Sequence, residues 1–255
     1  MYLDQKHNLI KQIKLLKNKY KLIGIKAEFE AEGSSFDDVS NLRSITLESN
    51  TKLFVKIGGV EAINDINKCL EIGVDGIIAP MVESKFAVYK FVDFFRKKKL
   101  NKLPHLSINI ETKTAYNNLT EILKKTDGYI NNITVGRSDL SKSYFDKKIY
   151  PDSKFISDII LDIATKVKQH NMTLTVGGSL SAKTINIYNK SKKIKKSINK
   201  METRKVILPT NKFMSVNAIN DALKFENIYI LFKNEMYNFK SESDMNRLAI
   251  LTTRK

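Results

Sequence analysis

Two acidic residues stand where predicted strands end, and their side chains could together hold a metal ion. Glu111 closes the apolar run LSINIE (106–111), and Asp139 follows the run NITVGR (132–137) within GRSDLS. If these runs are neighbouring parallel strands of a barrel, both carboxylates lie at the same mouth. Like charges at that distance repel unless a cation or a proton intervenes, and a hard divalent ion is the natural answer. For each acid alone, capping of the following helix is the structural alternative.

The elements that would position these acids alternate regularly along the chain. Short apolar runs are separated by segments with apolar residues three and four positions apart, which is typical of strands alternating with amphipathic helices around a parallel sheet. This rhythm predicts an α/β fold, a closed (β/α)8 TIM barrel. The expected strands are 22–28, 53–58, 76–81, 106–111, 132–137, 173–178, 204–208 and, as a C-terminal strand that closes the barrel, 227–232.

A single domain is expected over residues 1–255, because barrels of this kind reach that length and no linker rich in Gly, Pro or Ser divides the chain. The chain starts with a helical pattern rather than a strand, so a strand at 227–232 would join its two ends. We place the barrel core at about residues 20–235. Residues from about 238 to 255 are expected to form a polar C-terminal tail or a short helix.

The net charge of +17 comes mostly from lysine spread along the chain. The basic runs lack the interleaved aromatic residues of a base-stacking surface, so we expect no nucleic-acid partner. No window has the apolar length of a membrane span, and the basic start lacks the features of a secretory signal. We therefore predict a cytoplasmic protein without a membrane partner, and the single cysteine, Cys69, excludes an internal disulfide framework.

Charged and small residues also stand at the other predicted strand ends, where the chemistry of a barrel belongs. Acids follow the first strand at alternate positions, a lysine beside two glycines ends the second, and glycines that permit close approach of a ligand or loop end the sixth. Zinc is improbable, because the three histidines lie on helices or at the opposite end of a strand. Besides the two acids, the candidate site residues are Glu28, Glu30, Lys56, Arg137, Gly177, Gly178 and Arg204.

The segments INIETKTAYNNLTEI and GRSDLSKSY resemble the paired signature of the HpcH/HpaI aldolase and citrate lyase β-subunit family, whose members are barrels that bind pyruvate or phosphoenolpyruvate. CLEIGVDGIIAPMVES is similar to the strand that precedes this signature in the family, and the resemblance covers about residues 22–180. It implies a magnesium or manganese ion held by Glu111 and Asp139. In the family this ion chelates pyruvate or the 2-keto acid being cleaved, and it stabilises the pyruvate enolate as a Lewis acid. Relatives form closed oligomers, so we also expect a homo-oligomer.

The chain departs from the family pattern in three places. Lys56 stands where the family usually has an arginine that supports the enolate oxygen, which keeps the positive charge but loses the planar, bidentate fork. The histidine base of the aldolase branch is absent, so Glu28, Glu30 or a metal-bound water would take the proton. Arg137 replaces a small or apolar residue, and it either binds a substrate carboxylate or phosphate or pairs with a strand-one glutamate.

These features together predict an enzyme, a carbon–carbon lyase of the class II, metal-dependent aldolase type that acts on a 2-keto acid. One alternative is an acyl-CoA lyase of the citrate or malyl-CoA lyase type. Another is a barrel that binds a metabolite without turnover. Late in the chain, Glu202 and Arg204 form either a structural ion pair or part of the pocket wall.

Overall fold

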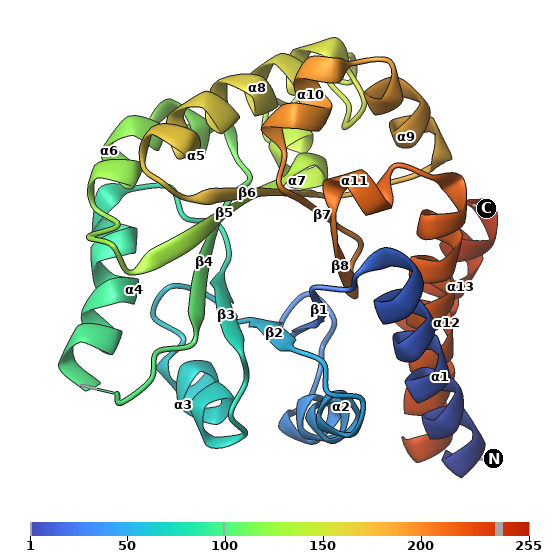
Figure 1. Cartoon of the computed structure of the whole chain (residues 1–255). Coiled ribbons are helices and arrows are strands. Elements are labelled where there is room, and N and C mark those ends of the chain that lie inside the picture. Colours follow the sequence, from blue (N-terminus) through green and yellow to red (C-terminus); the bar gives the residue numbers. More distant parts are fainter. Residues whose placement is uncertain (1, 99, 238–241, 255) are drawn as a thin grey trace.

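The computed structural model describes residues 2–98, 100–237 and 242–254, and within them eight strands close into one barrel surrounded by helices (Figure 1). This is the predicted (β/α)8 architecture. The strands are β1 (Gly24–Glu28), β2 (Leu53–Lys56), β3 (Gly76–Ala79), β4 (His105–Ile110), β5 (Ile130–Gly136), β6 (Thr173–Gly177), β7 (Lys200–Glu202) and β8 (Val206–Pro209).

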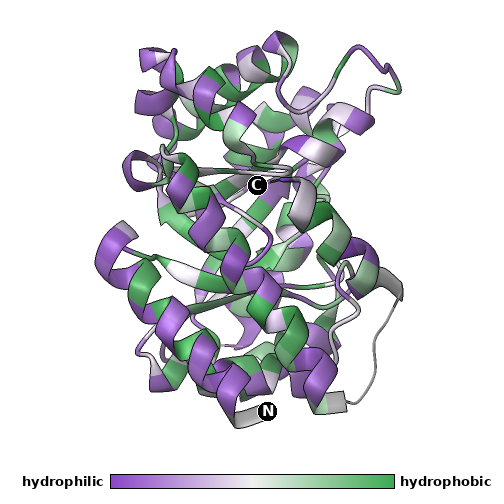
Figure 2. Ribbon diagram, turned by 90° about the vertical axis from the view of Figure 1, so that its right-hand side faces the viewer, coloured by the Kyte–Doolittle hydropathy of each residue, from purple (hydrophilic) through white to green (hydrophobic). Residues whose placement is uncertain are grey.

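The helices form a shell around the barrel, and Figure 2 shows hydrophilic and hydrophobic residues alternating along them, as a shell with one face on the core requires. None of the described helices is long and apolar enough to cross a membrane. The helices are α1 (Tyr2–Tyr20), α2 (Phe36–Glu48), α3 (Ile63–Glu71), α4 (Lys85–Lys98), α5 (Lys113–Asn117), α6 (Leu119–Lys124), α7 (Arg137–Lys142), α8 (Lys154–Gln169), α9 (Ala182–Asn189), α10 (Lys192–Ser197), α11 (Thr210–Phe213), α12 (Val216–Tyr237) and α13 (Glu242–Thr253).

The barrel closes through a hairpin and not through a C-terminal strand. Strands β1 to β7 pair in parallel with their chain neighbours, whereas β8 runs antiparallel to both β7 and β1. Thr203 stabilises the tight turn, because its hydroxyl accepts the backbone N–H groups of Lys205 and Val206. The seventh predicted strand, 204–208, therefore corresponds to β8 and has the opposite direction to the one expected.

The predicted strand at 227–232 is wrong, because these residues belong to α12. The buried residues Ala222, Phe225, Tyr229 and Phe232 recur three or four positions apart and form one helical face. α12 packs along α1, so the two ends of the chain meet through helices (Figure 1). In the segment expected as a tail, residues 242–253 form α13, while residues 238–241 and 255 lie outside the described residues.

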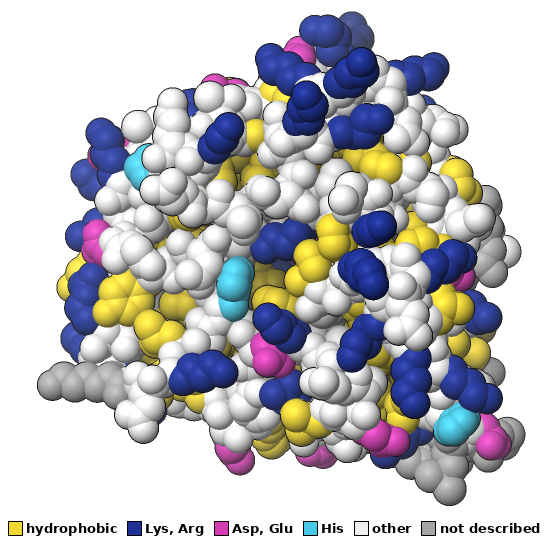
Figure 3. All heavy atoms as spheres, viewed as in Figure 1, with side chains coloured by type: hydrophobic (Ala, Val, Ile, Leu, Met, Phe, Trp, Pro, Cys, Tyr) yellow, Lys and Arg dark blue, Asp and Glu magenta, His cyan; other side chains and the backbone are white. Residues whose placement is uncertain are grey.

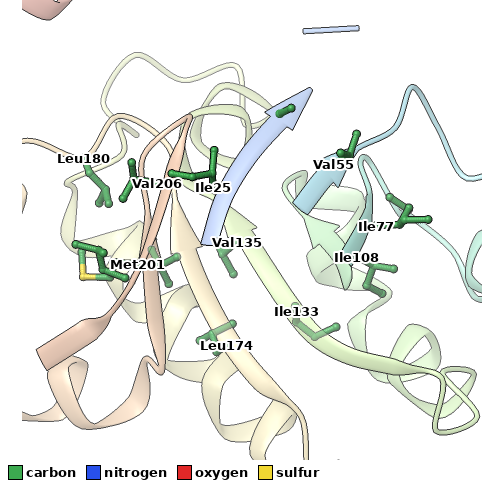
Figure 4. Close-up of a cluster of buried hydrophobic side chains, with 14 of the residues drawn as sticks. Ile25, Val55, Ile77, Ile108, Ile133, Val135, Leu174, Leu180, Met201 and Val206 are labelled. Atoms are coloured by element: carbon green, nitrogen blue, oxygen red, sulfur yellow. The ribbon is translucent and has the colours of Figure 1, made fainter. Parts of the chain in front are cut away.

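The apolar core lies between the barrel and the helix shell. Side chains on the outer face of successive strands form one buried cluster, which Figure 4 shows in part. All of its members are at most 8% exposed. The labelled members are Ile25, Val55, Ile77, Ile108, Ile133, Val135, Leu174, Leu180, Met201 and Val206.

The inside of the barrel is mostly polar, in contrast to this outer core. A small apolar cluster of Phe54, Ile78 and Ile207 fills one level of the lumen. It fits because Gly24 and Gly76 lie beside the Phe54 ring, where an added Cβ would come within 2.5 Å and 2.3 Å of ring carbons. The buried polar residues on the inward positions of the strands are Lys26, Glu28, Ser107, Asn109, Asn132, Thr134, Thr175 and Glu202.

Candidate functional site

Glu111 and Asp139 lie at the carboxyl end of the barrel, after neighbouring strands. β4 and β5 pair in parallel, with Ile110 opposite Val135. Glu111 follows Ile110 directly, and Asp139 lies in the first turn of α7, which begins just after β5. Glu111 is 3% exposed, while Asp139 in the first turn of α7 is half-buried. The negative charge of Asp139 contributes to raising the pKa of Glu111, so the two carboxylates interact. The adjacency expected from the sequence is thus present.

The Glu111 carboxylate is held in place by two neighbours. The backbone N–H of Met81 donates to Oε1 at 3.0 Å, and the Asn109 amide donates to Oε1 at 3.3 Å and Oε2 at 3.2 Å. Met81 follows β3 directly after Pro80 and has a positive φ of 51°, so the strand conformation ends before this donor. Burial is the main cause that raises the pKa of Glu111, although the charge of Lys56 and the Met81 hydrogen bond oppose it. A bound cation would favour the charged form of this carboxylate.

Neither acid is the N-cap of the helix that follows it, although Asp139 lies in the first turn of α7, where a negative charge also complements the helix dipole. The N-cap of α5 is Thr112, whose hydroxyl accepts the backbone N–H of Ala115 at 3.0 Å. The N-cap of α7 is Gly136, and Asp139 makes no side-chain hydrogen bond or ion pair within the described residues. Both carboxylates are therefore available for a ligand.

Gly136 gives the Glu111 carboxylate its space. A Cβ on Gly136 would lie 2.3 Å from Oε2 and 3.0 Å from Cβ of Glu111, closer than real side chains approach. We expect Gly136→Ala to displace the carboxylate and to weaken Mn²⁺ binding about 10- to 100-fold, as second-shell changes at metal sites do. Calorimetric Mn²⁺ titration measures this, with Gly59→Ala as the control because its Cβ would meet nothing within 4 Å. Equal affinities in the two variants would contradict this role of Gly136.

Lys56 is one end of a buried chain of alternating charges. Its Nζ lies 2.9 Å from Oε2 of Glu28, whose Oε1 lies 3.2 Å from Nζ of Lys26, and that ammonium lies 2.7 Å from Oε1 of Glu202. The Lys56 side chain is 17% exposed, the most accessible of the four. The charge of Lys56 also lowers the pKa of Glu111, so this row of ion pairs ends in a positive charge near the Glu111 carboxylate.

The two candidate bases have opposite environments. Burial opposes ionisation of Glu28, but the charges of Lys26 and Lys56 outweigh it and hold its pKa at about 2. Such a carboxylate is too weak a base to accept a proton near neutral pH, so the role expected for Glu28 as a base does not fit the structure. Glu30 is exposed and lies against Gly58, and its carboxylate has no hydrogen-bond or ion-pair partner within the described residues. Glu30 is the carboxylate of the two that stays available.

Arg137 lies inside the protein and does not face the barrel mouth. Its side chain is 0% exposed, and Nη1 lies 2.7 Å from Asp152. Its other donors reach carbonyl oxygens, among them Gly177 at 3.2 Å and Gly178 at 2.7 Å. With its donors used in this way, Arg137 cannot bind substrate as expected, and its partner is Asp152 instead of a strand-one glutamate. It ties the start of α7 to the end of β6.

Gly177 and Gly178 make room for protein atoms. A Cβ on Gly178, which has a φ of 83°, would lie 2.7 Å and 2.8 Å from the backbone nitrogens of Ser138 and Arg137. A Cβ on Gly177 would lie 2.8 Å from Cγ of Glu202. The two glycines therefore allow α7 and β7 to approach the end of β6, as expected for a loop and not for a substrate.

Arg204 lies in the turn between β7 and β8, at the carboxyl end of β7. Its Nε is 4.0 Å from Glu32, and Glu202 is paired with Lys26, so the ion pair between Glu202 and Arg204 that the sequence suggested does not form. Lys205 next to it also pairs with Glu32 and lies over the Tyr229 ring. Substrate binding by Arg204 stays a prediction.

The residues at this mouth fit a hard divalent ion of the magnesium type. Two carboxylates on neighbouring strand ends provide oxygen ligands, and such ions keep several water molecules or substrate oxygens in the remaining positions. Asn109 supports this interpretation, because its Oδ1 is buried without a hydrogen-bond partner in the described part of the chain. No group of three or more His, Cys, Asp or Glu side chains among the described residues could form a closed all-protein metal site. An open site of two acids is the arrangement that the chain offers.

Comparisons with known proteins agree with the fold. The family model described as HpcH/HpaI aldolase/citrate lyase matches residues 39–173. A solved HpcH/HpaI aldolase from Desulfitobacterium hafniense DCB-2 is 12% identical, with a TM-score of 0.60 over 76% of this chain and 81% of that protein. An HpcH/HpaI aldolase/citrate lyase family protein from Burkholderia cenocepacia J2315 is 11% identical, with a TM-score of 0.58 over 71% and 79%.

A variant of the citrate synthase SbnG is also similar, with 17% identity and a TM-score of 0.56 over 71% of this chain and 77% of that protein. No curated protein sequence matches the chain. At these identities the solved structures support the fold, and the family match carries the relationship.

Proposed function

The chain belongs to the HpcH/HpaI aldolase/citrate lyase family, whose chemistry is of the lyase or aldolase type, and from this we propose a divalent-metal-dependent carbon–carbon lyase that acts on a 2-keto acid through a pyruvate enolate. The observation that carries the proposal is the meeting of Glu111 and Asp139 at one barrel mouth, with Lys56 close enough to lower the pKa of Glu111. A cytoplasmic location and a homo-oligomeric state remain predictions from the sequence.

Each residue of the mouth has a role in this proposal. Glu111 and Asp139 would hold Mg²⁺ or Mn²⁺, which supplies Lewis-acid chemistry at the substrate's keto oxygen when bound. Met81 and Asn109 orient the Glu111 carboxylate through their hydrogen bonds. Lys56 supplies positive charge for the C2 oxygen as negative charge develops on it.

The proton transfer is assigned to Glu30. In the cleavage of a 4-hydroxy-2-keto acid, its carboxylate takes the proton of the 4-hydroxyl group, and the C3–C4 bond breaks. The oxygen left at C4 forms the aldehyde carbonyl, and the bond's electron pair stays on the three-carbon fragment as the enolate of pyruvate. A proton delivered to C3 then completes pyruvate, so atoms and charge balance. Glu28 takes no part in this transfer, because its ion pairs with two lysines hold it ionised.

A panel of 4-hydroxy-2-keto acids tests the proposal. We expect pyruvate release from at least one panel member with Mg²⁺ or Mn²⁺ and none after chelation. Turnover of a malyl- or citryl-CoA thioester in place of every panel member would favour the acyl-CoA lyase. Pyruvate binding without turnover of any compound would favour a metabolite-binding barrel, and either outcome would overturn the aldolase proposal.

Lys56→Arg tests the charge at the C2 oxygen. We expect this variant to keep or raise kcat/KM, because arginine retains the charge and adds a bidentate fork. Lys56→Met, which removes the charge, should lower kcat/KM about 10²- to 10³-fold, the cost of losing one stabilising donor at a developing oxyanion. Complete inactivity of Lys56→Arg would show that the lysine has a role of its own.

A further inference from the structure

The opposite end of the barrel has a cavity that the proposed reaction does not use. Its volume is about 800 Å³. It lies among the segments that precede β3, β4 and β5, with α2 at one side, so it opens at the amino ends of the parallel strands. A volume of this size suits a small-molecule ligand. The lining residues that matter for its chemistry are Arg43, Lys52, Lys102, His105, Tyr129 and Asn131.

The acids in the cavity lining are already paired. Asp75 accepts from Arg43 at 2.7 Å and from the backbone N–H of Leu53 at 2.9 Å. Asp127 accepts from Arg96 at 2.9 Å and lies 3.6 Å from Lys125, both outside the lining. The cavity therefore contains no carboxylate that could neutralise its remaining cations.

Two lysines and a histidine lie close together at this end: Lys52 and His105 line the cavity, and Lys200 lines a chamber next to it together with His105. Lys52 precedes β2, His105 begins β4 and Lys200 begins β7. Burial is the main cause that lowers the pKa of His105 to about 4 and that of Lys200 to about 8, and repulsion from Lys52 lowers both further. Glu202 attracts Lys200, but its own ion pair is with Lys26. The ammonium groups of Lys52 and Lys200 make no hydrogen bond or ion pair within the described residues.

His105 joins the cavity to the inside of the barrel. The same ring lines a second chamber of about 20 Å³, together with Thr134, Thr175 and Lys200. Nδ1 of His105 and Nε of Arg43 are both buried, and neither has a hydrogen-bond partner in the described part of the chain. Buried polar nitrogens normally have a partner, so these two indicate a missing hydrogen-bonding group at the cavity wall.

Lys52 is exposed and Lys200 is half-buried, but within the described residues neither pairs with an acid, unlike several lysines on the helices. Lys97, Lys154 and Lys166 each pair with an acid four positions earlier or later on a helix, and they lie on solvated faces. On the face that Figure 3 shows, basic side chains are widely spread, with fewer acidic ones between them. The cavity differs from these faces because basic side chains from separate strands lie at a concave surface whose acids are already paired.

We propose that this cavity binds the phosphate group of a small phosphorylated molecule beside Lys52 and His105. Lys200, which lines the inner chamber together with His105, adds positive charge to this site. Lys102 and Asn131 extend the polar side of the site, since the Asn131 Oδ1 already accepts the N–H of Leu106 and leaves its amide donor for a ligand. Tyr129 and Leu103, which is 40% exposed, form an apolar wall for the ligand's carbon skeleton. This site is separate from the carboxyl-terminal mouth, so it does not depend on the proposed function.

Histidine NMR spectra test this site, because the chain has only three histidines. The probe is inorganic pyrophosphate, titrated at constant ionic strength. We expect saturable shifts of the His105 resonances and a rise of about one unit or more in its pKa, because an anion beside a histidine favours the charged ring. His7 on α1 and His170 after α8 should stay unchanged and serve as internal controls.

A double variant, Lys52→Gln with Lys200→Gln, should weaken the binding at least tenfold, whereas Lys154→Gln, which removes an exposed helical lysine, should have no effect. Equal shifts of all three histidines, or equal affinity in the two lysine variants, would mean non-specific attraction of anions to a basic protein and would overturn the proposal. Tight binding of an oligonucleotide in preference to pyrophosphate would also overturn it.

Discussion

Replacing Glu111 by Gln is expected to abolish metal-dependent activity while leaving the protein folded. The amide keeps the size of the side chain but loses the negative charge, and amides are poorer ligands for hard divalent ions. Asp139→Asn should act in the same way, because each carboxylate supplies one of the two acidic ligands at the mouth. We expect a fall of at least about 10²- to 10³-fold in kcat/KM, comparable to removing one electrostatic group at an oxyanion.

The matched control is Glu121→Gln, which changes an exposed acid on α6 that pairs with Lys124. Mn²⁺ titration of the variants separates loss of the ion from loss of chemistry, and circular dichroism checks the fold. Activity that survives both Glu111→Gln and Asp139→Asn would exclude the proposed metal site. Loss of activity with unchanged Mn²⁺ affinity would show that the ion binds at another place.

Lys26→Met should cause the largest loss of stability among the variants considered. Lys26 is 6% exposed and lies between the carboxylates of Glu28 and Glu202. Removing it leaves two buried carboxylates close together, of which only Glu28 keeps an ion pair within the described residues, with Lys56. Breaking a buried pair in this way costs about 3–5 kcal/mol. Urea denaturation measures the change in the free energy of unfolding.

The control for this variant is Lys154→Met, in which an exposed pair with Asp158 is lost and a change within about 0.5 kcal/mol is expected. Adding Glu202→Gln to Lys26→Met should restore part of the lost stability, because it removes one of the unpaired charges. A Lys26→Met protein as stable as the control would contradict the buried chain of charges.

The ion pairs of Glu28 also make the stability of the folded protein depend on pH. The pKa of Glu28 is lowered to about 2 in the folded protein from 4.5, chiefly because Lys26 and Lys56 outweigh the effect of burial. Glu28 therefore contributes stability that is present above about pH 4.5 and is lost as the pH falls towards 2. This is a consequence of the ion pairs that also place Lys56 at the barrel mouth.

The sequence was sufficient to predict the first six strands, because each is a short apolar run that ends in a polar or glycine-rich segment. It was also sufficient for Glu111 and Asp139, since parallel neighbours bring their carboxyl ends together. The direction of β8 could not be predicted in the same way, because three residues, Thr203 to Lys205, decide between a hairpin and a crossover. The run at 227–232 is too short and too apolar to distinguish a strand from a helix. Only the buried residues at three- and four-residue intervals from Ala222 to Phe232 indicate the helix.

The buried charges were harder to predict than the metal ligands. Lys26 and Asn109 each stand two positions before an expected site acid, so the alternation of a strand could have placed them on the same inner face. The partner of Arg137 could not be found, because Asp152 lies fifteen residues further on in an irregular segment. A buried arginine is also an exception to the usual exposure of its residue type.

The most direct test of the central claim is the exchange of the C3 protons of pyruvate for deuterium in D2O, followed by NMR. This reaction requires only the enolate and no second substrate. We predict exchange that depends on Mg²⁺ or Mn²⁺ and on Glu111, and that is lost in Glu111→Gln but kept in Glu121→Gln. Exchange at the same rate without a divalent ion, or in the Glu111→Gln protein, would contradict a metal-stabilised enolate at this site.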